Sequence, residues 1–96
     1  HSEEMERFLE YLRNLAEGQE AYFAEHRRFA AEPPWPRGQV PSSVTVVVVE
    51  ATDSGWAGTA RRPELPERVC AIHVGKATPP LPGAVEGTPL CAEVDR

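Results

Sequence analysis

Apolar and polar positions follow each other along the first part of the chain with the spacing of an α-helix. The apolar positions recur every three or four residues, and Gln19 and His26 are the polar members of the same face. The pattern predicts one amphipathic helix over residues 1–31, ended by Pro33 and Pro34. Because a lone helix of this kind is unstable in water, we expect its C-terminal half to cover a partner surface. The face predicted to enter the core consists of Phe8, Leu9, Leu12, Leu15, Tyr22 and Phe23.

Strand-like patterns follow a proline-rich stretch. Residues 44–51 are β-branched or apolar at nearly every position, which predicts a strand in the centre of a sheet. Residues 56–61 and 69–74 alternate with the period of a strand, and residues 90–94 predict a short final one. Short links between successive strands favour antiparallel pairing. The fold class predicted is α+β, with one long helix packed on a small antiparallel meander sheet of three or four strands.

The length and the prolines indicate one domain over residues 1–96. The chain has 96 residues and ten prolines, and proline marks irregular connectors because it restricts the backbone and removes a hydrogen-bond donor. The predicted order is the helix, a proline-rich connecting loop at 32–43, the antiparallel sheet at 44–74 and a C-terminal region at 75–96.

Cys70 and Cys91 are the two cysteines of the chain, so one intramolecular bridge is available. They flank a stretch rich in proline and glycine that has little else to hold it, which favours a disulfide and an oxidising compartment. Closing a loop of roughly 20 residues would stabilise the fold by about 3 kcal/mol. The alternative is two buried free thiols in a cytosolic protein.

Charge and residue spacing argue against several kinds of chemistry. The net charge of −5 disfavours direct nucleic-acid binding, which needs clustered lysine and arginine. His1, His26 and His73 are scattered, with no zinc-ligand spacing, and His73 is predicted on the solvent side of its strand. Asp53, in a turn, offers too few oxygen ligands for calcium. We therefore predict no catalytic residue, no metal site and no cofactor.

Trp35 lies between two prolines and has two interpretations. Its ring can be an exposed anchor that contacts a partner protein. Alternatively, the ring can fold back onto the end of the helix and fasten the loop to the core. The second interpretation is favoured because large aromatic rings are mostly buried, and Trp35 is kept as a possible partner contact.

Three elements, in this order, resemble type IV pilins and the related pseudopilins of type II secretion. They are the helix stretch Leu12–Phe23, the strand segment Gly55–Ala60 with its small-aromatic-small pattern, and the pair Cys70 and Cys91, placed like the pair that closes the C-terminal region of these proteins. The resemblance implies a structural subunit of a type IV pilus-like filament. Such a subunit is exported, stays in the inner membrane before assembly, and then forms a cell-surface or periplasmic filament without catalysing a reaction.

The resemblance also implies an apolar N-terminal helix half, which this sequence does not contain. Through that half the subunit would contact other copies and other pilin-like subunits, and the domain without it is expected to be a monomer. Two alternatives stay open: a minor pilin or type II secretion pseudopilin, and a small secreted binding or inhibitor module. The disulfide and the lack of a clear calcium loop favour a pilin over a pseudopilin. About 20 apolar residues upstream of Ser2 would exclude the secreted module.

Overall fold

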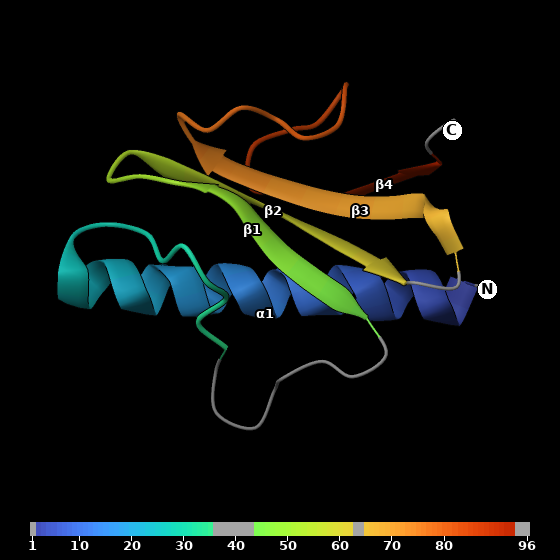
Figure 1. Cartoon of the computed structure of the whole chain (residues 1–96), viewed down its shortest axis with the longest axis horizontal. Helices are drawn as coiled ribbons and strands as arrows, with labels where there is room; N and C mark the ends of the chain where they lie inside the picture. The colour runs from blue at the N-terminus through green and yellow to red at the C-terminus, as the bar shows by residue number, and fades with distance from the viewer. Residues whose placement is uncertain (1, 36–43, 63–64, 94–96) are drawn as a thin grey trace.

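The computed structural model describes residues 2–35, 44–62 and 65–93, and these form one helix and one sheet (Figure 1). The strands lie in the order β1-β2-β3-β4, and every neighbouring pair is antiparallel. The predicted α+β architecture, with a helix packed on a four-stranded antiparallel meander, is therefore confirmed. The elements are α1 (Ser2–His26), β1 (Thr45–Ala51), β2 (Gly55–Arg62), β3 (Leu65–Gly75) and β4 (Leu90–Glu93).

The main core lies between α1 and the sheet, where the helix packs on β2 and β3. Close approach is possible at Gly58, because a Cβ atom there would lie only 2.9 Å from Cδ2 of Leu15. Leucine on the helix and glycine on the strand are thus matched in shape. The buried members of this core are Phe8, Leu12, Leu15, Trp56, Ala60, Cys70 and Ile72.

The helix is shorter than the predicted residues 1–31, since it ends at His26. Arg27 adopts a left-handed backbone conformation, with φ of 62°, and its N–H donates to the carbonyl oxygen of Phe23 at 2.8 Å. The N–H of Phe29 then donates to the carbonyl oxygen of Thr52 at 3.0 Å, which draws the chain toward the turn between β1 and β2. The helix therefore ends well before the two prolines that were predicted to end it.

Strand β1 lies at the edge of the sheet, so its predicted central position is wrong. Its valines point alternately toward the main core and toward the opposite face of the sheet. Val46 and Val48 pack against the main core, whereas Val47 and Val49 point away and are 45% and 55% exposed. An irregularity in the pairing with β2 falls between Val48 and Glu50. The continuous apolar run in β1 therefore belongs to an edge strand, and the side chains on one of its faces are exposed to solvent.

The chain between β3 and β4 folds back over the sheet face opposite α1 (Figure 1). A second small core forms there, and the N–H of Gly87 donates to the carbonyl oxygen of His73 at 2.8 Å. The side chain of His73 is only 6% exposed, so its predicted position on the solvent side is wrong. The residues of this second core are Val69, Ala71, Leu81, Leu90 and Ala92.

The predicted disulfide between Cys70 and Cys91 is confirmed. The two residues are direct register partners on β3 and β4, separated by 21 positions in the sequence. The C-terminal region therefore consists of an irregular segment closed by the disulfide, as predicted, and of the predicted final strand, β4, which joins the sheet. Two carboxylates hold the intervening chain: Glu50 accepts from the N–H of Thr78 at 3.0 Å, and Glu86 accepts from the N–H of Gly75 at 2.7 Å.

Some predicted boundaries lie outside the described residues. These are the first residue of the predicted helix, residues 36–43 of the connecting loop, and residues 94–96 at the C-terminus. Within the described chain, β1 begins at Thr45 and β4 ends at Glu93. The third predicted strand, 69–74, is longer in the structure, where β3 covers Leu65–Gly75.

Candidate functional site

The predicted core face of α1 divides into a buried part and a half-buried part. Leu9, Tyr22 and Phe23 are half-buried. The three residues of the predicted face that are almost wholly buried against the sheet are Phe8, Leu12 and Leu15.

Aromatic rings at the C-terminal end of α1 stack on neighbouring rings. Tyr22 stacks on His26 with ring centroids 4.0 Å apart, and Phe23 stacks on Phe29 at 4.7 Å. A cavity of about 210 Å³, lined in part by Phe23 and Trp56, lies at this end. The helix thus packs most closely through its middle, between Phe8 and Gln19, and not through its C-terminal half as predicted.

Gln19 joins the helix to the segment that follows it. Its buried side-chain amide donates from Nε2 to the carbonyl oxygen of Ala30 at 2.9 Å, and its Oε1 accepts from the N–H of Ala30 at 2.7 Å. Gly18 lies beside it, and a Cβ atom at that position would clash with the carbonyl oxygen of Pro34. The two residues let the segment after the helix lie directly on α1. The sequence signal was a polar amide on an apolar face, next to a mid-helix glycine.

We expect Gln19→Met to lower the free energy of unfolding by about 1–3 kcal/mol. Ala30 is buried, and its backbone N–H and carbonyl oxygen would both lose their hydrogen-bond partner, the Gln19 side chain. Methionine keeps nearly the same length and volume, so the loss of hydrogen bonds dominates. Chemical denaturation measures the change, and hydrogen exchange at the amide of Ala30 should become faster. The matched control is Glu20→Met, at an exposed position, with a change within about 0.5 kcal/mol. Equal stabilities of the two variants would contradict the structural role of Gln19.

Trp35 is half-buried and packs against the main core. Its ring therefore takes the folded-back position that the sequence favoured. A contact between Trp35 and a partner protein stays a prediction, which the partial burial of this residue leaves open.

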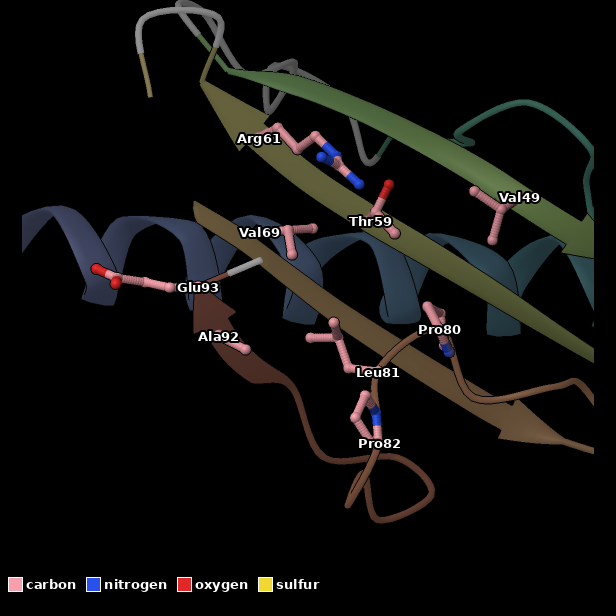
Figure 2. Close-up of a pocket in the computed structure, with 9 residues that line it drawn as sticks. All are labelled: Val49, Thr59, Arg61, Val69, Pro80, Leu81, Pro82, Ala92 and Glu93. Carbon is pink, nitrogen blue, oxygen red and sulfur yellow. The ribbon is translucent and has the colours of Figure 1, made fainter. Parts of the chain in front are cut away.

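A groove of about 560 Å³ lies on the sheet face opposite α1, between β1 and the chain that links β3 to β4 (Figure 2). Its walls are mostly apolar, and the side chain of Arg61 extends along β2 toward Thr59. Glu93, on β4, pairs with Arg68 at 3.0 Å. The lining residues are Val49, Thr59, Arg61, Val69, Pro80, Leu81, Pro82, Ala92 and Glu93.

Sequence reasoning did not find this groove. Its lining residues come from four strands and one irregular segment, so no regular spacing of residue types along the sequence predicts it. The one available signal was the run of valines in β1, which is apolar on both faces although a single core needs only one.

The groove is suited to binding an apolar group and not to catalysing a reaction. Its polar side chains are one hydroxyl, one guanidinium and one carboxylate, which do not make a nucleophile with a base. Within residues 2–35, 44–62 and 65–93, no group of three or more His, Cys, Asp or Glu side chains could hold a metal ion. Nδ1 of the buried His73 has no hydrogen-bond partner in that part of the chain.

The structure thus defines a class of fold: an N-terminal helix on a four-stranded antiparallel meander, with the last two strands joined by a disulfide. Comparison of the chain with family models, with curated proteins and with solved structures finds no match in any of the three. No helix in the described part of the chain combines the length and the apolar character that crossing a bilayer needs.

Proposed function

We propose that this domain is the head of a structural subunit in an exported, type IV pilus-like filament. In this role the protein acts by assembly and makes or breaks no bond. Its partners are further copies of itself and other pilin-like subunits. The subunit resides in the inner membrane before it enters a cell-surface or periplasmic filament.

The order of the elements carries this proposal. A helix of 25 residues comes first, a four-stranded antiparallel meander follows, and a disulfide fastens the last strand to the strand before it. This is the order that the resemblance to pilins and pseudopilins predicts. The disulfide, which the resemblance places in an oxidising compartment, supports export.

The proposed assembly works through an apolar segment upstream of α1. The helix includes Ser2, and in this proposal the upstream apolar segment is the first half of the same helix. Its apolar surface would supply the anchor in the membrane and, later, the packing between subunits. The head domain keeps its own core, because Phe8, Leu12 and Leu15 are buried against the sheet.

A small secreted binding module is the second candidate. Phe8 is only 2% exposed, so the apolar face of α1 is already covered by its own sheet at the second turn and needs no other partner there. The open groove opposite α1 would then be the binding surface. A minor pilin or pseudopilin, which starts a filament or binds a client, shares the proposed fold and differs in its abundance within the filament.

The test is the protein with its natural upstream residues, expressed in its own cells. We expect about 20 apolar residues before Ser2, and fractionation should place the protein in the inner membrane and in filaments sheared from the surface. A matched variant with three charged residues in the middle of that segment should leave the membrane, because each charge there is unfavourable by about 3 kcal/mol.

Two results would overturn the proposal. One is a mature protein that leaves the cell with no apolar segment before Ser2, which would put the secreted binding module first. The other is a membrane-anchored protein that never occurs in sheared filaments. A low but constant proportion in those filaments, relative to another subunit, would identify a minor pilin.

A further inference from the structure

Large apolar side chains are exposed at three positions of the described chain. Val47 and Val49 are on the outer face of β1, and Val85 is on the segment that links β3 to β4. Val49 lines the groove, so an apolar hollow and a protruding apolar side chain occur on the same molecule. Val85, at 65% exposure, is the most exposed of the three.

Hydrogen bonds restrain the turn that carries Val85. Gly83 and Gly87 flank it with φ of 80° each, and the N–H of Thr88 donates to the carbonyl oxygen of Val85 at 3.0 Å. Glu86, next in the chain, accepts from the N–H of Gly75 at 2.7 Å. A side chain presented on a fixed turn loses little conformational entropy when it binds.

We propose that the groove opposite α1 receives the Val85 turn of a second copy of this chain. The floor and walls made by Val49, Val69 and Leu81 would cover the apolar side chain. Each copy carries both halves of the contact, so each can give one turn and receive another. Both halves lie in the described residues, and the inference therefore does not rest on the filament proposal.

Opposite charges on the two surfaces favour the Val85 turn as the group that fills the groove. The turn carries the carboxylate of Glu86 beside Val85, and the groove carries the guanidinium of Arg61. A guanidinium has five N–H donors, so Arg61 can add a contact to those it already makes within its own chain. Glu93 also lines the groove, and because it is paired with Arg68 the two side chains together add no net charge there.

The contact is small, so it is weak in dilute solution. One side chain in one groove buries much less surface than a stable dimer interface. We expect a dissociation constant on the order of 1 mM, which keeps the domain monomeric at micromolar concentration. Copies that are held side by side reach effective concentrations of about 1 mM, and in such an arrangement the contact would form.

The first test is the ¹H–¹⁵N spectrum of the 96-residue chain between about 20 µM and 2 mM. Amide signals of groove residues Thr59 and Leu81 and of turn residues Val85 and Gly87 should shift together with concentration. Val85→Asp should abolish the shifts at the groove. Ala24→Asp, which adds the same charge at an exposed position of α1, should leave them in place.

The second test traps the contact covalently. With dissolved oxygen as the oxidant, a mixture of the Val85→Cys and Val49→Cys proteins should form a mixed disulfide dimer about tenfold faster than a mixture of Ala24→Cys and Val49→Cys. Equal rates, or a spectrum that does not change with concentration, would overturn the proposal. Groove shifts that persist in Val85→Asp would also overturn it, since another part of the second copy would then occupy the groove.

Discussion

Replacing Leu15 by alanine lowers the free energy of unfolding by about 2–5 kcal/mol. The side chain is fully buried, and its Cδ2 atom lies where a Cβ on Gly58 would come within 2.9 Å. Helix and strand are already in close contact at this point, so the surrounding backbone cannot move in to fill the space that the leucine leaves. Urea denaturation followed by circular dichroism measures the loss.

Leu9→Ala is the matched control, because it removes the same atoms from the same helix. Leu9 is half-buried, so we expect a loss less than half of that at Leu15. Equal losses at the two positions would contradict the arrangement in which the middle of α1 makes the closest contact with β2. A loss at Leu15 below about 1 kcal/mol would contradict its place in the core.

Removing the disulfide by the double substitution Cys70→Ala and Cys91→Ala lowers the free energy of unfolding by about 3 kcal/mol. The bridge spans 21 positions, and cutting it restores the conformational freedom of that loop in the unfolded chain. Because Cys70 is fully buried in the main core, the substitution also removes packing there. Denaturation of the oxidised wild type and of the variant gives the difference.

A reducing agent provides the control for that experiment. It should lower the stability of the wild type toward that of the variant and leave the variant unchanged. The mass of the unreduced wild type should be lower than that of the reduced protein by two hydrogens. Alkylation of both cysteines in the native, unreduced protein would contradict the disulfide.

Much of the fold could be predicted because it follows from the local spacing of apolar residues along the chain. The spacing from Phe8 to Leu15 requires a helix with one apolar face, and alternation in β2 and β3 requires strands. The bridge between Cys70 and Cys91 followed from there being two cysteines around a poorly supported segment. For the helix and the strands, residues a few positions apart contain the whole signal.

The differences arise where distant segments decide the structure. The helix ends at His26, and the left-handed residue that follows it, Arg27, is not glycine, so the usual sequence signal for a helix end is absent. His73 is buried by a segment whose path over the sheet follows from hydrogen bonds of Glu50 and Glu86, far from it in sequence. The groove combines both effects, since an edge strand and an irregular segment form its two sides.

The pair formed by Gln19 and Ala30 has a consequence for changes in chain length. The side-chain amide exchanges two hydrogen bonds with one backbone residue, as two residues do in an antiparallel ladder, and the partners are 11 positions apart. Such a pair recognises a backbone position and not a side chain. Inserting or deleting one residue between positions 19 and 30 would present a different peptide group to the amide. The chain from α1 to Ala30 therefore tolerates substitution at its exposed positions far better than any change in its count of residues.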